Sequence, residues 1–256
     1  MHSIKHILYP TNLSEASQEA LRYTCAFAKV YNASITLIHV VKPMVDLGNS
    51  SIAQFQLMQL ARQRAEQELE AFVQPFRIHK INFILEVTSG YAREQIAAYA
   101  NDKKEIDLIL IATNDSFSLE KVFYGSVVTN SIQHTNKPVL VVPKGLRFRH
   151  IEQVAYLKPR GSASSNRADG VDELVRHFGA ALHELRHCKD IEGNNLETEI
   201  TYLDDYRLAL QTFIYKKKIE LLVTRLPQLN AFQRWLGLDT TKRIALKSTI
   251  PVLLLK

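Results

Sequence analysis

The chain has 256 residues, of which 46% are apolar and 23% charged, and it carries a formal net charge of +6. This length suits one large domain or two small ones, and two separated cysteines, Cys25 and Cys188, exclude a disulfide framework. Its cationic residues are scattered and no apolar run approaches the ~18 residues of a membrane span, so we expect a cytoplasmic chain with no nucleic-acid or membrane partner.

Apolar runs alternate with helical periodicities along the first part of the chain. Ser14 is placed to cap a helix, and Glu15 suits the positive start of that helix. The predicted elements, in chain order, are the strand HILYP, a helix after Ser14, the strand SITLIHVV, a helix over about 52–73 stopped by Pro75, the strand KINFILEV, a helix from Ala92 to near Asp102, the strand IDLILIA and the strand VLVV after Pro138. Strands that alternate with helices imply a parallel sheet with right-handed crossovers.

The later part of the chain begins with the strand QVAYL and a polar loop at 160–170, followed by a predicted helix from Val171 to about His187. From Ala155 to Glu199 the chain advances by 44 positions, against 79 from Ile7 to Glu86. One strand–helix unit is therefore missing or reduced. A part this short has trouble burying a core of its own, so we expect it to pack tightly on the first.

The chain repeats itself at an offset of 113 positions. The passage that starts at Glu86 aligns without a gap with the passage that starts at Glu199, and the aligned pairs are Ile106 with Ile219, Asp107 with Glu220 and Pro138 with Pro251. A repeat of domain size indicates duplication. We therefore expect two domains, 1–146 and 147–256, the second of them degenerate.

Four stretches of the chain resemble the universal stress protein family. They are ILYPTNLSEASQEAL, LIHVV, DLILIATND and GSVVTNSIQHTNKPVLVVP. The resemblance implies a tandem of two doubly wound, Rossmann-like α/β domains with parallel sheets. Some members of that family bind ATP, others do not, and dedicated catalysis is not the usual role of the family. We therefore expect a stress-response binding module with at most weak ATP hydrolysis.

The resemblance also implies a nucleotide site. Family members that bind ATP carry a glycine, two residues, a glycine, nine residues, and then a glycine with serine or threonine. On this chain that pattern falls on Ala112, Asp115, Gly125 and Ser126, with the spacing intact and both leading glycines replaced. Carried over in this way, the residues that would hold ATP or another adenine nucleotide are Pro10, Thr11, Asn12, Val40, Ala112, Asp115, Gly125, Ser126 and Val127.

The replacements weaken this implied site. The Asp115 carboxylate opposes a phosphate, at a cost of about 1–3 kcal/mol when the two charges lie 4–6 Å apart and are poorly screened. Asn12 stands where the family usually has an acidic residue, and its amide can accept one hydrogen bond without a charge. The alternative is that the loop after Ala112 only closes the edge of the sheet and binds nothing. The chain would then be an interaction protein.

In that alternative, the final strands PVLVV and PVLLL pair within one chain and form an internal pseudo-dimer, which can itself assemble as a homodimer.

A further motif competes with this interpretation. HELRH, at 183–187, fits the pattern H-E-x-x-H, which on a helix brings two imidazoles onto one face. His183 and His187 would then bind zinc, with Glu184 as the general base of a hydrolase. No third ligand stands out downstream, so the two histidines are weak candidates and no metal is required.

Overall fold

A computed structural model of the chain describes residues 4–42, 51–112, 134–157, 170–185, 206–225 and 250–256, with the backbone alone at 51–53 and 206–209. Its strands and helices are β1 (His6–Thr11), α1 (Glu15–Tyr31), β2 (Ser34–Val41), α2 (Ser51–Val73), the 3-10 helix η1 (Gln74–His79), β3 (Phe83–Ser89), α3 (Ala92–Asp102), β4 (Leu108–Ala112), β5 (Val139–Val142), β6 (Gln153–Leu157), α6 (Val171–Phe178), β7 (Ala181–Leu185), α7 (Tyr206–Lys216), β8 (Leu221–Arg225) and β9 (Val252–Leu255). Within these ranges, no helix is both long and apolar enough to cross a membrane.

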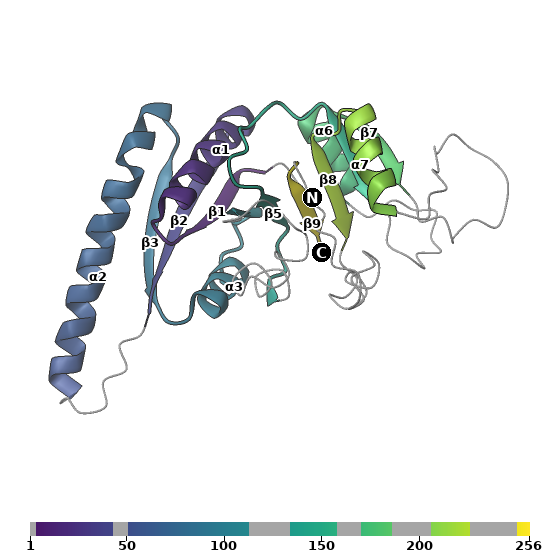
Figure 1. Ribbon diagram of the computed structural model, residues 1–256. Helices are drawn as coiled ribbons and strands as arrows, with labels where there is room; N and C mark the ends of the chain where they lie inside the picture. Colours follow the sequence, from purple (N-terminus) through teal and green to yellow (C-terminus); the bar gives the residue numbers. More distant parts are fainter. Residues whose placement is uncertain (1–3, 43–50, 113–133, 158–169, 186–205, 226–249) are drawn as a thin grey trace.

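The strands form one nine-stranded sheet in the order β3-β2-β1-β4-β5-β9-β8-β6-β7 (Figure 1). The first five strands of this order run parallel to one another, and so do the last four. The two groups meet where β5 pairs antiparallel with β9. The α/β architecture with parallel strands is therefore confirmed, and the strands of the two groups run in opposite directions.

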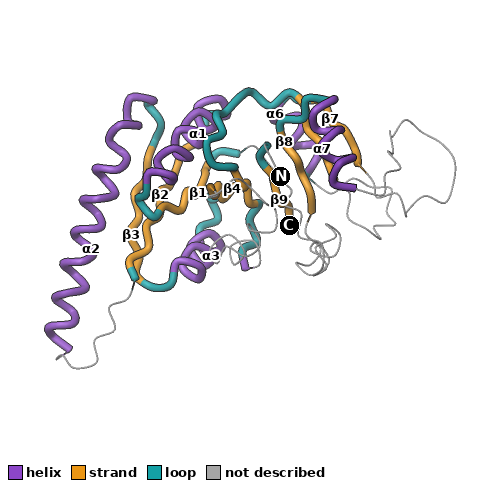
Figure 2. Tube along the Cα trace, viewed as in Figure 1, coloured by secondary structure: helices purple, strands orange, loops and turns teal. Residues whose placement is uncertain are grey.

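Helices cover both faces of the sheet (Figure 2). Along β1 the side chains alternate, so that Ile7 and Tyr9 join one hydrophobic cluster and Leu8 joins the other. Buried residues of α1, α2 and α6 belong to the first cluster, and those of α3 and α7 belong to the second. Each cluster also contains residues of β5 and β9, so the two hydrophobic layers run without interruption across the junction of the groups.

Local sequence signals account for the ends of the first three α-helices. The Ser14 hydroxyl accepts from the Ser17 backbone N–H (3.2 Å), which confirms the predicted cap of α1. Helix α2 spans Ser51–Val73, and the chain then continues as η1 through Pro75, because proline is tolerated in the first turn of a helix. The predicted limits of α3, Ala92 and Asp102, are confirmed.

The predicted helix over 171–187 is wrong in its second half. Helix α6 ends at Phe178, and Gly179 takes a left-handed conformation with φ of 66°. Its N–H bonds back to the Arg176 carbonyl (3.2 Å), which closes the helix, and Ala181 then starts strand β7. The residues that follow have a helical sequence pattern, but they form strand β7, which pairs with β6 and extends the parallel sheet.

The sequence repeat reappears in the geometry. Strands β4 and β8 lie 113 positions apart in sequence, and so do β5 and β9. Asp107 accepts backbone hydrogen bonds from Lys5 (2.8 Å) and His6 (3.0 Å) at the start of β1. Its counterpart Glu220 accepts in the same way from the backbone of 152 and 153 at the start of β6. The same contacts thus order the strand starts in both groups.

The units β1–α1–β2 and β6–α6–β7 correspond at a second offset, 147 positions. The last residues of α1 and α6, Tyr31 and Phe178, match at this offset, and each helix is followed by a left-handed residue, Asn32 or Gly179. The change of offset from 147 to 113 corresponds to 34 positions of sequence. In the first part of the chain, this difference falls between the end of β2 and Glu86, a region that includes α2.

Aromatic rings pack across the junction between the two groups of strands, on the face of the sheet that α1 and α6 cover. The ring of Phe178 lies 4.9 Å from that of Tyr31 and 6.2 Å from that of Phe27, centroid to centroid. Phe148, from the connection between β5 and β6, lies edge-on to Phe27 at 5.7 Å. Helices from both groups therefore share one aromatic cluster, and neither group has a core independent of the other.

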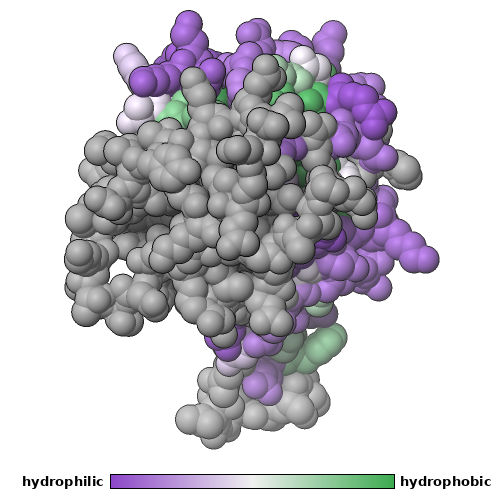
Figure 3. Space-filling model, turned by 90° about the vertical axis from the view of Figure 1, so that its right-hand side faces the viewer, coloured by the Kyte–Doolittle hydropathy of each residue, from purple (hydrophilic) through white to green (hydrophobic). Residues whose placement is uncertain are grey.

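The surface outside the junction is largely polar, with an apolar exception on α2. In Figure 3, the coloured surface visible around the grey residues is mostly hydrophilic. Helix α2 exposes Phe55 (62%) and Leu60 (61%), and the first half of this helix projects beyond the sheet (Figure 1). The second half of α2 packs on the sheet through Leu69 and Val73.

Replacing Phe178 by alanine tests whether the two groups fold together. We expect Phe178→Ala to lower the free energy of unfolding by about 3 kcal/mol, since a buried phenylalanine is truncated against rings of α1. Urea denaturation followed by circular dichroism would show one transition shifted as a whole. The matched control, Phe55→Ala on exposed α2, should stay within about 0.5 kcal/mol. Two separate transitions, only one of them shifted, would contradict a shared core.

Candidate functional site

The strand order places a candidate site at the carboxyl ends of β1 and β4. The chain proceeds from β1 to β2 and β3 on one side, and β4 and β5 lie on the other. In open α/β sheets, ligands bind outside the carboxyl ends of the strands at the point where the order reverses. Thr11 ends β1 and Ala112 ends β4, so two of the predicted site residues flank this reversal.

A network of hydroxyl groups builds the turn from β1 into α1. Thr11 Oγ1 accepts from the Leu13 backbone N–H (3.0 Å) and lies 2.8 Å from Ser17 Oγ. The Tyr9 hydroxyl donates to the Ser17 carbonyl (2.7 Å) from within the core. Leu13 has φ of 61°, a left-handed conformation that this network holds in place. The Thr11 side chain therefore shapes the turn at this edge of the sheet.

Asn12 presents a donor at the same turn. Its Oδ1 accepts from the Ser14 backbone N–H (3.2 Å) and from Ser14 Oγ (2.7 Å). The sequence predicted that this amide accepts a hydrogen bond from a ligand. In the structure, Asn12 Oδ1 already accepts two hydrogen bonds from Ser14. The exposed Nδ2 group has no acceptor among the residues of known placement, so the chemistry that Asn12 offers is donation.

His39 lies at the same edge of the sheet, although the sequence did not single it out. Its Nδ1 donates to the Thr11 carbonyl (2.9 Å), which ties the end of β2 to the end of β1. The only signal was its position directly before Val40. Because side chains alternate along a strand, His39 and Val40 lie on opposite faces of the sheet.

Val40 lies on the face that α3 covers. It packs, partly buried, against the hydrophobic cluster that contains Ile38 and Ile96. Pro10 pairs with Ile38 in the neighbouring strand. The structure therefore brings Pro10, Thr11, Asn12, Val40 and Ala112 to one edge of the sheet, where they end or follow three neighbouring strands. Asp115, Gly125, Ser126 and Val127 lie outside the described residues.

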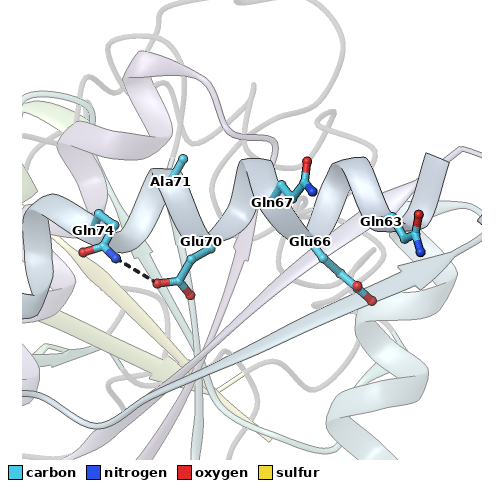
Figure 4. Close-up of a pocket in the computed structure, with 6 residues that line it drawn as sticks. All are labelled: Gln63, Glu66, Gln67, Glu70, Ala71 and Gln74. Carbon is cyan, nitrogen blue, oxygen red and sulfur yellow. Dashed lines mark hydrogen bonds between the residues drawn. The ribbon is translucent and has the colours of Figure 1, made fainter. Parts of the chain in front are cut away.

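A hollow lies along α2 (Figure 4). It measures about 690 Å³ and is lined by Gln63, Glu66, Gln67, Glu70, Ala71 and Gln74. All six residues come from one helix and the residue that follows it, so no second wall opposes them. Glu70 is engaged by Gln74 (3.2 Å) and by Arg77 (2.8 Å). This hollow is an open helix surface and offers no enclosed ligand site.

The structure removes the helix on which the zinc motif depended. His183 and Glu184 lie on strand β7, where successive side chains point to opposite faces. His183 Nε2 donates to Gln153 Oε1 (2.7 Å) on the neighbouring strand, and its ring lies edge-on to Phe213 at 5.9 Å. His187 lies beyond the described part of the chain. Across the described ranges, no group of three metal-ligating side chains comes together.

Burial lowers the pKa of three histidines. Desolvation is the main cause of the lowered pKa of His6, although Glu105 and Asp107 act in the opposite direction. Burial likewise lowers the pKa of His177, helped by Lys5, and the pKa of His183, helped by Lys217. His177 Nε2 is buried without a hydrogen-bond partner among the described atoms. The folded chain therefore favours neutral imidazoles at these positions.

Comparison with known proteins identifies first the fold and then the family. The chain has a doubly wound α/β architecture of the kind that carries a crevice at the point of strand reversal. The universal stress protein family matches residues 3–143, which is more than half of the chain. The chain therefore belongs to the universal stress protein family.

Curated relatives match the same part of the chain. Two universal stress proteins of Methanocaldococcus jannaschii, MJ0531 and MJ0577, are each 28% identical to it, over 141 and 157 residues. Each match covers 55% of this chain, and the matches cover 82% and 95% of the two relatives.

Solved structures match the chain along nearly its whole length. A universal stress protein from Archaeoglobus fulgidus covers 99% of this chain and 97% of its own, with a TM-score of 0.64 and 14% identity. A Pseudomonas aeruginosa protein described as functionally unknown covers 99% of this chain and 93% of its own, with a TM-score of 0.55 and 13% identity. At these identities the likeness concerns the fold alone.

The lowered pKa values of these histidines lead us to expect that the folded chain becomes less stable as the pH falls. Because the folded chain lowers the pKa of His6, His177 and His183 below 6.5, the unfolded chain binds more protons as the pH falls. Stability should be full above pH 6.5 and should fall as the pH drops through the lowered values. Urea titrations at pH 7.5 and 5.5 would measure this loss.

A histidine substitution separates this effect from the titration of carboxylates. His183→Gln should reduce the loss of stability between the two pH values, and His79→Gln on the exposed 3-10 helix should leave it unchanged. Equal stability of the unsubstituted chain at pH 7.5 and 5.5 would contradict the assignment.

The two hydrogen bonds that Asn12 accepts lead to a prediction about stability. Asn12→Ala removes the acceptor of two hydrogen bonds from Ser14 and should destabilise the chain by about 1 kcal/mol. Asn12→Asp keeps an acceptor in the same place, next to the positive start of α1, and should retain or raise stability. Urea denaturation of both variants would check this order; a more stable alanine variant would show that the turn does not need this side chain.

Proposed function

We propose that the chain is a tandem universal stress protein whose first domain, 1–146, binds an adenine nucleotide and whose second domain, 147–256, is degenerate. The matched offsets of 113 and 147 positions support the tandem arrangement, because elements and their hydrogen bonds recur together. The likeness to the Archaeoglobus fulgidus protein over 99% of the chain supports a fold shared by both parts.

One observation carries the proposal of nucleotide binding. Thr11, Val40 and Ala112 come together at the ends of neighbouring strands, at the point where the strand order reverses. Val40 offers an apolar surface for a base, and Asn12 adds a neutral donor beside it. Small-molecule sites combine apolar walls with a few placed polar groups in this way. Binding of an adenine nucleotide such as ATP, without dedicated catalysis, is therefore the proposed role in a stress response.

The phosphate end of the proposed site depends on residues outside the described ranges. Gly125, Ser126 and Val127 would provide backbone and hydroxyl donors at a helix start, which is where anions bind. Ala112 adds only a methyl group in place of the first family glycine. Asp115 opposes the phosphates and should weaken binding relative to glycine by like-charge repulsion of about 1–3 kcal/mol, which is roughly a five- to 150-fold change in affinity.

A second candidate function is a ligand-free interaction protein. The antiparallel pairing of β5 with β9 favours it, since this contact inside one chain occupies an edge that a single domain leaves open. Such an internal pseudo-dimer presents its surfaces to protein partners and needs no nucleotide. Nucleotide binding separates the two candidates.

Two substitutions test nucleotide binding. Asp115→Gly should tighten ATP binding about tenfold by removing the repulsion of the phosphates. Gly125→Asp should abolish binding, because it adds a charge and a side chain where the backbone meets the phosphates. Isothermal titration calorimetry at fixed salt would measure both, with Asp102→Gly at the exposed end of α3 as the matched control.

Native mass spectrometry of gently purified protein provides an independent check for carried nucleotide. No carried nucleotide, together with no binding of ATP at millimolar concentration, would overturn the proposal and leave the interaction protein as the function.

A further inference from the structure

The connection between β5 and β6 is a short cationic segment on the outside of the molecule. At 144–150 the sequence reads KGLRFRH, with Lys144, Arg147, Arg149 and His150 and no acidic residue. All four basic side chains are exposed. In Figure 2 this segment belongs to the loop that passes from α1 to α6. We call residues 144–150 the cationic connection.

Two apolar side chains anchor the cationic connection. Leu146 and Phe148 are partly buried and pack against the hydrophobic cluster that contains the buried residues of α1 and α6. The Phe148 ring lies edge-on to that of Tyr23 on α1, at 5.4 Å between centroids. Burial at 146 and 148 alternates with exposure at 147 and 149, as it does along an extended chain. The packing therefore keeps Arg147 and Arg149 together on the solvent side.

These two arginines lack the carboxylates that other arginines of the chain have. Among the residues that the structure describes, no carboxylate forms an ion pair with Arg147 or Arg149. On α2, by contrast, Arg62 and Arg64 are also two positions apart, and each pairs at 2.9 Å with a glutamate one turn further along the helix. Within the same described part, the backbone N–H groups at 147–149 have no backbone acceptor either.

The spacing of the two arginines defines the chemistry that complements them. Along an extended chain, residues two positions apart lie on one side and about 6.6 Å from each other. An extended peptide with a carboxylate at every second position presents the same spacing. Each guanidinium can then bind one carboxylate in the bidentate geometry that arginine favours. The peptide backbone can also accept from the free N–H groups, as extended peptides do when they bind along an exposed chain.

Other polyanions fit this surface less well. Single-stranded nucleic acid binds through rings on which its bases stack, and here Phe148 packs inward against Tyr23. Anionic membranes hold peripheral segments through apolar residues directed into the lipid, whereas Leu146 and Phe148 are directed into the protein. Charge and spacing therefore favour an acidic peptide.

We propose that the cationic connection docks an acidic segment of a partner protein, which binds in an extended conformation with alternating carboxylates on Arg147 and Arg149. The site lies on the face of α1 and α6 and uses none of the residues of the proposed nucleotide site. The proposal therefore stands or falls independently of ATP binding, and it adds the chemical class of partner that the chain recognises.

Fluorescence anisotropy with two labelled peptides tests the proposal at fixed low salt. One peptide alternates glutamate with threonine, and the other carries the same number of glutamates at every third position, which places successive carboxylates on opposite sides of an extended chain. The full chain should bind the alternating peptide more tightly. The double variant Arg147→Gln/Arg149→Gln should weaken this binding about tenfold, since each exposed arginine–carboxylate pair is worth up to about fivefold in affinity.

The matched control is Arg62→Gln/Arg64→Gln on α2. It removes the same two charges at the same sequence spacing, but from arginines that glutamates of their own helix already engage. This variant should bind the alternating peptide as the unsubstituted chain does. Melting temperatures should stay close to that of the unsubstituted chain for both variants, because Phe148 and its contacts are unchanged.

Four outcomes would overturn the proposal. The first is that no peptide binds at millimolar concentration. The second is that both double variants weaken binding equally, which would show a response to net charge alone. The third is equal affinity for the two peptides. The fourth is that oligo(dT) or vesicles containing phosphatidylserine bind through Arg147 and Arg149 more tightly than the alternating peptide does, which would assign this surface to nucleic acid or to a membrane.

Discussion

The antiparallel pairing of β5 with β9 is the contact on which the rest of the structure depends. Each strand has four residues, all buried, and would otherwise be an open edge. Leu140 lies directly opposite Leu253, and these two residues are 113 positions apart, which is the offset of the sequence repeat. Corresponding residues thus face each other, as they do across a local two-fold axis. This pairing turns two sheets into one and lets both hydrophobic layers continue across it.

The same symmetry extends to polar contacts at the strand starts. Asp107 and Glu220 each accept from two backbone N–H groups of the adjoining strand. Exposed strand ends leave such donors to water, whereas a carboxylate makes charge-assisted hydrogen bonds that are about twice as strong as neutral ones. Aspartate and glutamate differ by one methylene group, yet both fulfil this role. The same contact is therefore made at both strand starts by two different carboxylates.

The sequence predicted most strands because buried parallel strands appear as continuous apolar runs, as in β4 and β5. It failed at β7, where residues after Ala180 fit a helical pattern and the glycine at 179 was not taken as the end of α6. Pairing with β6 decided that segment, and no local pattern reports such pairing. Side-chain roles were harder to predict, because they depend on contacts that form only in the folded chain. The oxygen of Asn12 is engaged by Ser14, and His39 Nδ1 donates to the Thr11 carbonyl of the neighbouring strand.

The proposed tandem explains why a reduced second domain can persist. A domain that lacks a strand–helix unit has too little apolar surface to bury alone, and here α6 places Phe178 among the rings of α1. The first group is stabilised as well, because β9 covers the open edge of β5, and β5 pairs with β4, the strand that ends at Ala112. The proposed site at the carboxyl edge of the first domain would therefore be supported by a neighbour that need not bind anything itself. In the proposed tandem, the second domain serves as a permanent structural partner of the first.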